Sequence, residues 1–446
     1  MAGSRRRGTV TRCDVAIVGG GVVGTAALYA LSRYTNIPKI ILIEKHPDVA
    51  SVQSSRDSNS QTLHFGDIET NYSLKKARSV NAGAEMLAAY LDRRGRGTFR
   101  KFPKMVLAVG KKEVEFLERR YREFKKVFPK MRLIRRDEIA RIEPNVVKGR
   151  RAGEELAAIL SPDGYAVDYG ALSRSFVRES RRSGKRVAVL TDKKVLKIER
   201  DGDRYKVKFK GGHVEASAVI VAASGYSMKF AHMMGYGREY IILPVSGTFF
   251  LAPKVLNGKV YTVQHPKLPF AAVHGDPSLG NSGETRFGPT ARVLPILEPR
   301  KYRSFFDFMG LFRFRVDGFH SLARIMYDGV IFRFVMRNVL MDVPFVGKHV
   351  FARDVRKIVP AMRTRHLRHG RVGGIRPQLV DTRTKSLFLG EAKIVGDGII
   401  FDISPSPGAS MCLRNAQESA EKVVQFLGGK YRFDRARFLS DGRRRK

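Results

Sequence analysis

A glycine-rich turn between two apolar strands constrains this chain more than any other feature. Residues 13–18 are typical of a buried strand, the turn Gly19-x-Gly21-x-x-Gly24 follows, and residues 25–34 have the pattern of an Ala- and Leu-rich helix. A second apolar strand over 39–43 ends at Glu44. The spacing predicts one βαβ unit of the Rossmann type, which binds a dinucleotide.

Each residue of this turn has a separate expected role. Gly19 permits the tight turn, Gly21 lets the backbone approach a pyrophosphate, and Gly24 lets helix and strand pack closely. The helix N-terminus offers free N–H groups to the phosphates. Glu44 would accept hydrogen bonds from the ribose hydroxyls of the adenosine.

The chain downstream favours FAD over NAD as the dinucleotide. An NAD domain would continue as alternating strands and helices, but here the second strand leads into a polar loop over 50–66. The next apolar strand, 218–222, is followed by small residues up to Gly225 and lies far along the chain. This spacing indicates a nucleotide-binding domain that a second domain interrupts.

Length and composition predict a folded protein with a large core. The 446 residues are 43% hydrophobic, so extensive disorder is not expected. The two cysteines, Cys13 and Cys412, cannot form a disulfide framework or a zinc cluster, and we expect no metal site.

The formal net charge of +41 is extreme for a protein of this length. Such a field attracts nucleic acid, anionic lipid or an acidic small substrate, whereas a merely solvated basic surface explains it equally well. No RNA-binding module with stacking aromatics is recognisable, so we expect no specific nucleic-acid partner.

An aromatic and basic stretch over 301–340 is the most unusual segment. Its pattern predicts two helices broken near Asp317-Gly318. These helices would either lie on an anionic bilayer or pack as ordinary helices of the interrupting domain, and the sequence leaves both readings open. No run reaches about 18 uncharged apolar residues, so we expect no membrane-spanning helix.

Five blocks of sequence together resemble malate:quinone oxidoreductase-like flavoproteins, which belong to the broader group of D-amino-acid oxidase and L-2-hydroxyglutarate dehydrogenase. The blocks occur in this order: residues 19–24, residues 54–72 with His64, Val273-His274-Gly275-Asp276 leading to Phe287-Gly288-Pro289, Gly374-Ile375-Arg376-Pro377-Gln378, and Ser406-Pro407-Gly408-Ala409-Ser410.

The resemblance implies an α/β protein with a Rossmann-like FAD-binding domain, interleaved with an α+β substrate domain on a mostly antiparallel sheet. The expected FAD-binding segments are 1–95, 155–238 and 371–446, and the expected substrate-binding segments are 96–154 and 239–370. Residues implied to contact FAD, besides the glycine turn, Glu44 and the turn at Gly225, are Arg56, Ser58, Asn59, Ser60, Val195, Gly408, Ala409 and Ser410.

The turn at 408–410 also has a physical reason to face the flavin. A helix predicted from about Ala409 to Leu427 would direct its N-terminal amides at the ring edge that becomes negative on reduction.

Oxidation of a 2-hydroxy acid needs a hydride acceptor at flavin N5, a base for the hydroxyl proton and cations for the carboxylate. The resemblance implies that His274 and His64 line the pocket, and we expect one to be the base and the other to bind substrate. Arg376, with Gln378 on the same side of a strand, is the expected carboxylate anchor, and Arg286 is a second candidate.

These features predict an FAD-dependent dehydrogenase that oxidises malate to oxaloacetate, a tricarboxylic acid cycle reaction, and passes electrons to a membrane quinone. The alternatives are oxidation of L-2-hydroxyglutarate, or an amine or amino-acid oxidase of the same fold. The expected location is the cytoplasm, with peripheral attachment to the inner face of the cell membrane as an option. The sequence predicts no oligomeric state.

Overall fold

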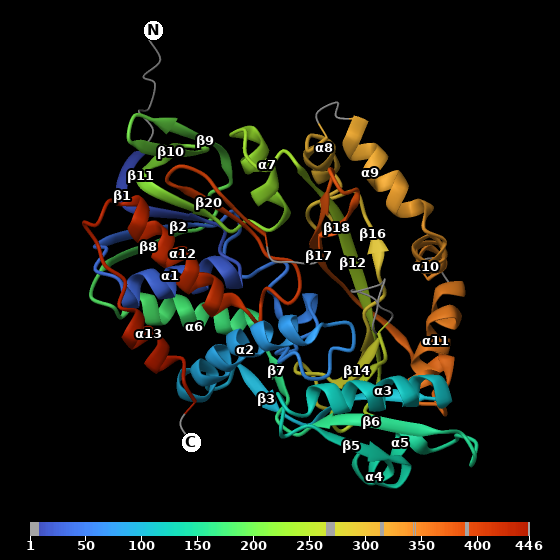
Figure 1. The fold of residues 1–446 in the computed structure, drawn as a ribbon. Helices are drawn as coiled ribbons and strands as arrows, with labels where there is room; N and C mark the ends of the chain where they lie inside the picture. Colours follow the sequence, from blue (N-terminus) through green and yellow to red (C-terminus); the bar gives the residue numbers. More distant parts are fainter. Residues whose placement is uncertain are drawn as a thin grey trace.

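The computed structural model describes residues 9–264, 273–312, 316–341, 343, 345–388 and 392–444. Two large sheets organise these residues (Figure 1). The first sheet has the order β19-β20-β11-β1-β2-β8, and the hairpin of β9 and β10 extends from β11. Its strands are β1 (Thr9–Val18), β2 (Lys39–Ile43), β8 (Arg186–Leu190), β9 (Val195–Asp201), β10 (Arg204–Phe209), β11 (Gly212–Val221), β19 (Ala392–Val395) and β20 (Ile399–Ile403).

Strand periodicity assigns the two faces of the first sheet to different layers. In β1, Val15 and Ile17 join the cluster beneath α1, whereas Ala16 and Val18 face the opposite layer, which contains the β9–β10 hairpin. Helices α1 (Val22–Tyr34), α6 (Tyr169–Arg181) and α12 (Cys412–Phe426) pack together on the first face. The core strands β20, β11, β1, β2 and β8 pair in parallel, so the predicted Rossmann-like fold is confirmed.

The second sheet has the order β18-β17-β12-β15-β14-β13-β4-β6-β5, with β16 beside β12. Its pairs are antiparallel except β13 with β4. The strands are β4 (Lys104–Val109), β5 (Arg132–Arg135), β6 (Leu156–Ser161), β12 (Tyr240–Pro253), β13 (Lys259–Thr262), β14 (His274–Pro277), β15 (Glu284–Gly288), β16 (Arg292–Val293), β17 (Arg368–Asp381) and β18 (Ser386–Phe388). A separate small sheet pairs β3 (Phe99–Lys101) with β7 (Tyr165–Val167).

The remaining helices surround these sheets. Helix α3 (Lys111–Phe124) covers one face of the second sheet and α11 (Val346–Ile358) covers the other. The others are α2 (Leu74–Arg94), α4 (Arg136–Ile142), α5 (Pro144–Val147), α7 (Gly225–Met233), α8 (Ser304–Met309), α9 (Val316–Tyr327), α10 (Gly329–Leu340) and α13 (Arg435–Asp441), with 3₁₀ turns at Arg56–Ser58 and Thr364–His366.

Sheet membership differs from the expected domain segments in two places. β6 and the β17–β18 pair belong to the second sheet, although the expected boundaries assign residues 155–238 and 371–446 to the FAD-binding domain. Which sheet a strand joins depends on its pairing partners, which local patterns do not reveal. The division into two domains itself stays a prediction.

The prediction of two helices in 301–340, broken near Asp317-Gly318, is right about a break there but misses a further one: the described residues of this segment form α8, α9 and α10. α8 ends at Met309 and α9 begins at Val316, so Asp317 and Gly318 lie in the first turn of α9, and the further break falls at Asp328. The Asp328 carboxylate accepts hydrogen bonds from the amides of Val330 and Ile331, so it caps α10. This N-cap aspartate was the local signal that the sequence analysis missed.

Candidate functional site

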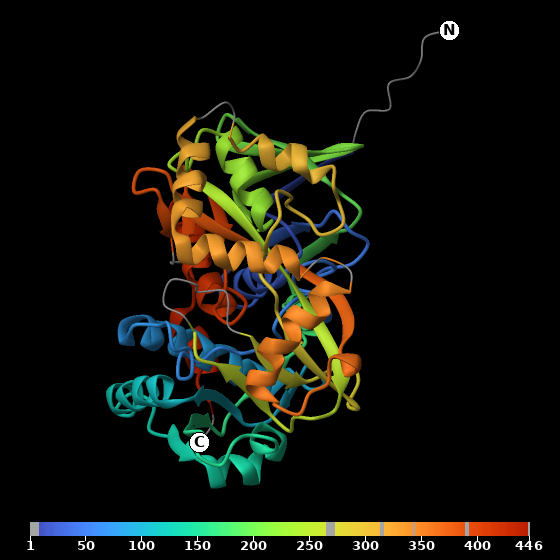
Figure 2. The same cartoon turned by 90° about the vertical axis from the view of Figure 1, so that its right-hand side faces the viewer.

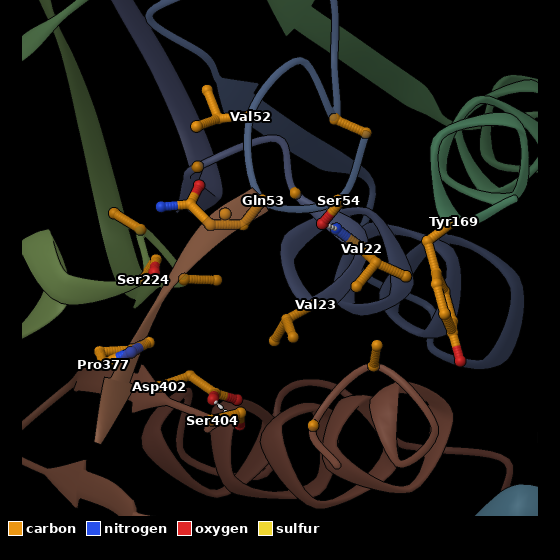
Figure 3. Close-up of a pocket in the computed structure, with 18 of the residues that line it drawn as sticks. Val22, Val23, Val52, Gln53, Ser54, Tyr169, Ser224, Pro377, Asp402 and Ser404 are labelled. Carbon is orange, nitrogen blue, oxygen red and sulfur yellow. Dashed lines mark hydrogen bonds between the residues drawn. The ribbon is translucent and has the colours of Figure 1, made fainter. Parts of the chain in front are cut away.

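A cavity of about 280 Å³ lies where the carboxyl ends of β1 and β2 meet the second sheet (Figure 3). Its walls come from widely separated segments of the chain. They are the β1–α1 turn, the loop after β2, residues 193–195, residues 222–224, residues 374–377 of β17 and the turn 404–410. Open α/β sheets bind their ligands at this end of the strands.

The three glycines of the turn have the geometry that a bound dinucleotide needs. Gly19 has φ +108°, and a Cβ there would lie 2.4 Å from the carbonyl oxygen of Ala222. A Cβ on Gly24 would lie 2.0 Å from the carbonyl oxygen of Gly19, so this residue serves the packing of helix on strand and does not line the cavity. Gly21 lines it and precedes α1.

Glu44 lies at the end of β2 with its carboxylate in the cavity wall. One carboxylate oxygen accepts a hydrogen bond from the backbone amide of Gly20 at 2.6 Å, and the other accepts one from the backbone amide of His46 at 2.9 Å. These bonds fix the side chain, and each oxygen keeps lone-pair capacity for a ribose hydroxyl.

Most of the other residues expected to contact FAD line the same cavity. They are Ser58, Asn59, Ser60, Val195, Gly408, Ala409 and Ser410. Arg56 does not line it: its guanidinium lies on the surface, 3.4 Å from the Asp57 carboxylate. Gly225 does not line it either, because it begins α7, and the preceding Ser224 lies in the wall instead (Figure 3).

The helix expected from about Ala409 to Leu427 begins later than expected. α12 starts at Cys412, and residues 407–411 form a turn whose amides at Gly408, Ser410 and Met411 bond to nearby carbonyl oxygens. The Pro-Gly sequence favours this turn and delays the helix. Among the described residues the amide of Ala409 has no hydrogen-bond acceptor, so this one N–H remains for a ligand in the cavity.

Several residues of the wall were missed by sequence reasoning. Ser54 accepts the Val22 amide at 3.0 Å and so ties the polar loop to the glycine turn, while Tyr169 and Asp402 complete the wall (Figure 3). Burial raises the pKa of Asp402, against the opposing charge of Lys393 and the hydrogen bond from Ser404. An acidic residue inside the apolar strand 399–403 was the available signal.

A second cavity, of about 70 Å³, adjoins the first. The two share Ser60, His64, Arg376, Pro405 and Ser406, so these residues form their common border. The second cavity is lined further by Glu69, Asn71, Tyr72, Lys76, Tyr261, Gln264, His274, Pro289 and Gln378.

His64 forms a hydrogen bond from its Nδ1 position to the carboxylate of Glu69, at 2.6 Å. Burial alone would raise the pKa of Glu69, but the hydrogen bond and charge of His64 and the charge of Lys104 outweigh it and lower this pKa to about 2. Glu69 is therefore an anion at neutral pH and fixes the orientation of the imidazole.

His274 lines the same cavity from β14 but has different surroundings. Its ring stacks on Tyr261 at 4.6 Å between centroids, and its Nε2 lies 3.5 Å from the Asp276 carboxylate. The carboxylate of Asp276 also contacts Arg286, so it is not dedicated to the histidine.

Arg376 and Gln378 lie on one side of β17 and both line the second cavity, as their spacing predicts. Burial lowers the pKa of Arg376 and the charge of Tyr72 opposes this, but guanidinium stays protonated in proteins. The amide nitrogen of Gln378 donates to the carbonyl oxygen of Phe388 at 2.7 Å, which leaves its side-chain oxygen for other partners.

Arg286 is not brought to either cavity. Its guanidinium contacts the Asp276 carboxylate at 3.1 Å and lies over the Phe249 ring at 4.6 Å to the centroid. Arg286 is thus a buried ion-pair partner of Asp276. In a sequence with so many arginines, the pattern of residues does not show which of them form internal ion pairs. The other cationic side chain in the lining of the second cavity is Lys76, from α2.

Residues 14–411 match the family model described as FAD dependent oxidoreductase, and the chain belongs to that family. The site fits this cofactor, because the glycine turn, Glu44 and the Ala409 amide supply matching donors and acceptors along one cavity. FAD is the cofactor, as predicted.

Within the family, the chain is 37% identical to the malate:quinone oxidoreductase of Helicobacter pylori, over 95% of this chain and 96% of that protein. It is 26% identical to human mitochondrial L-2-hydroxyglutarate dehydrogenase, over 95% and 91%. Its fold is that of the L-α-glycerophosphate oxidase of Mycoplasma pneumoniae with FAD bound (TM-score 0.64, 19% identity, 92% and 94% covered).

Proposed function

We propose that this protein oxidises malate to oxaloacetate with FAD and passes the electrons to a quinone. The names of its relatives support the substrate and the acceptor. The observation that carries the proposal is the border between the two cavities, where the buried Glu69 holds His64 and where Arg376 contributes a guanidinium. A base and a carboxylate anchor beside the cofactor cavity are what a 2-hydroxy acid requires.

We assign the base to His64. Its Nδ1 is engaged with an anion, so its Nε2 is the nitrogen that accepts the hydroxyl proton of the substrate, and the carboxylate of Glu69 stabilises the imidazolium that results. His274, stacked on Tyr261, binds the substrate in the same cavity. When bound, FAD supplies the acceptor for the electron pair from the substrate carbon.

The two carboxylates of malate need two cationic groups. Arg376 offers a planar fork that binds two oxygens of one carboxylate. Lys76 takes the place that the sequence assigned to Arg286, since it is the other cation in the lining. The side-chain amide of Gln378, beside Arg376, donates a hydrogen bond to the substrate or accepts one from it.

L-2-hydroxyglutarate remains the second candidate substrate, because it carries the same groups with one more methylene and because the chain is also similar to its dehydrogenase. An amine substrate is disfavoured, since the lining carries Arg376 and Lys76 as cations.

The quinone places the enzyme beside a membrane, and we propose a peripheral location on its cytoplasmic face. Among the described residues, no helix has the length and apolar character that crossing a bilayer requires.

Anaerobic reduction of the purified flavoprotein tests the proposed function. L-malate should bleach the visible absorption band of the flavin, L-2-hydroxyglutarate should do so more slowly, and glycine or D-alanine should leave it unchanged. Bleaching by amino acids but not by hydroxy acids would contradict the assignment.

A further inference from the structure

One face of the molecule exposes large apolar side chains. They come from the segment 302–346, which contains α8, α9 and α10 and begins α11, and include Tyr302, Phe306, Tyr327, Phe332, Val339 and Phe345. Phe306 is 75% exposed, Tyr327 92% and Phe345 89%. Figure 2 shows these helices side by side on the side that faces the viewer. We call the exposed side chains of 302–346 the α8–α11 face.

The helices are held by their inner sides, so the outward aromatics are not core residues. In α9, Ser321 and Ile325 are buried against the protein while Phe319 and Tyr327 are exposed. In α10, the buried Asn338 accepts the Ala291 amide at 2.8 Å. Exposed apolar patches of this extent on a folded protein mark an interaction surface.

The charges on this face are basic. Arg303, Arg324 and Arg333 are exposed and form no ion pair with any described residue. Of the acids in and beside this segment, Asp307 pairs with Lys229, Asp328 caps α10 and Asp354 pairs with Arg337 at 2.6 Å, whereas Asp317 is exposed in the first turn of α9. Aromatic side chains interleaved with unpaired arginines match the interface of an anionic bilayer, where rings enter the acyl boundary and guanidinium groups contact phosphates.

We propose that the α8–α11 face docks on the surface of an anionic lipid bilayer. The net charge of +41 complements such a surface and disfavours burial of this face against a second, equally basic copy of the chain.

A cavity of about 140 Å³ lies directly under this face, between α10–α11 and residues 289–291. Its lining includes Phe334, Met341 and Phe351. Residues 289–291 also line a smaller cavity that reaches Arg376, at the border of the FAD cavity. If the proposed function holds, a lipid-borne acceptor that enters from this face reaches two adjoining cavities, the smaller of which extends to Arg376.

Vesicle sedimentation of the FAD-loaded protein tests the docking surface. Vesicles of phosphatidylcholine with phosphatidylglycerol should bind the protein, and pure phosphatidylcholine vesicles should bind it weakly. The variant F306S/Y327S/F345S should lose at least about tenfold in affinity, and R303Q/R324Q should lose about tenfold. The matched controls V10S/L196S/V395S and R100Q/R432Q, on exposed residues elsewhere, should bind as the unchanged protein does.

Equal losses in the matched controls would overturn the proposal, because non-specific attraction of a basic protein would then explain binding. So would unchanged vesicle binding of F306S/Y327S/F345S. A dimer in solution that this variant dissociates would assign the face to a second copy instead. Sedimentation needs no turnover, so a failure of malate to reduce the flavin would refute the proposed function without affecting this result.

Discussion

At the scale of single residues, the two histidines of the second cavity differ in what orients them. Glu69 bonds to His64 at 2.6 Å and is dedicated to it, whereas Asp276 is shared between His274 and Arg286. We therefore expect His64→Ala to lower the rate of flavin reduction by malate about 10²–10⁴-fold, and His274→Ala to raise KM more than it lowers kcat.

Glu69→Gln should lower the rate of flavin reduction by malate less than His64→Ala does. The amide keeps the shape of the Glu69 side chain but not the charge that stabilises the imidazolium. Stopped-flow reduction of each FAD-loaded variant measures these effects. A His64→Ala protein that reduces at the original rate would transfer the role of base to another group.

Arg376 provides a second prediction at this scale. Arg376→Lys keeps the positive charge but loses the planar fork, so KM for malate should rise about tenfold or more while FAD stays bound. Steady-state kinetics with a soluble dye acceptor measures this. Arg286→Lys is the comparison, since that side chain lies outside both cavities and should affect unfolding temperature more than KM. Unchanged kinetics for Arg376→Lys would remove it from the site.

At the scale of elements, a substitution in the β1–α1 turn can weaken cofactor binding without preventing the chain from folding. A Cβ on Gly21 would contact only the Ser54 hydroxyl, at 3.4 Å, so the chain should fold with alanine there. The same Cβ occupies the space where the pyrophosphate approaches, and we expect Gly21→Ala to weaken FAD binding at least about tenfold. Fluorescence titration of the apoprotein with FAD, beside urea unfolding, measures both properties.

Gly153→Ala is the matched control for this experiment, because nothing lies within 4 Å of a Cβ there. It should change neither property. An unaltered FAD affinity in Gly21→Ala would show that the turn does not contact the phosphates.

At the scale of the whole molecule, the charge of +41 should act on association rather than on chemistry. A dianionic substrate is drawn to a basic protein by forces that salt screens. We expect kcat/KM for malate to fall several-fold when ionic strength rises from about 0.01 M to about 0.15 M, with kcat little changed. Initial rates with an uncharged dye acceptor measure it, and a kcat/KM independent of salt would contradict long-range steering.

The sequence by itself determined the parts of this protein that depend on neighbours along the chain. The βαβ unit with its glycines and Glu44, and the interruption of the nucleotide-binding domain before the strand that ends at Val221, follow from local periodicity and turn chemistry, because these act within a few residues. The FAD-dependent family was predicted from the resemblance of five sequence blocks, and it is confirmed. A local signal was also missed at Asp328, whose side chain caps α10 and separates it from α9.

Only the tertiary structure decided which polar groups meet. It brought Glu69 to His64, committed Arg286 to Asp276, put Lys76 in the cavity lining and left the aromatics of α8–α10 on the surface. The physical reason is that a charged or aromatic side chain takes its function from what surrounds it in space. Those surroundings depend on the fold even where the partners are near in sequence: Glu69 is five residues from His64 and Asp276 is ten from Arg286, and only the path of the backbone brings each pair into contact.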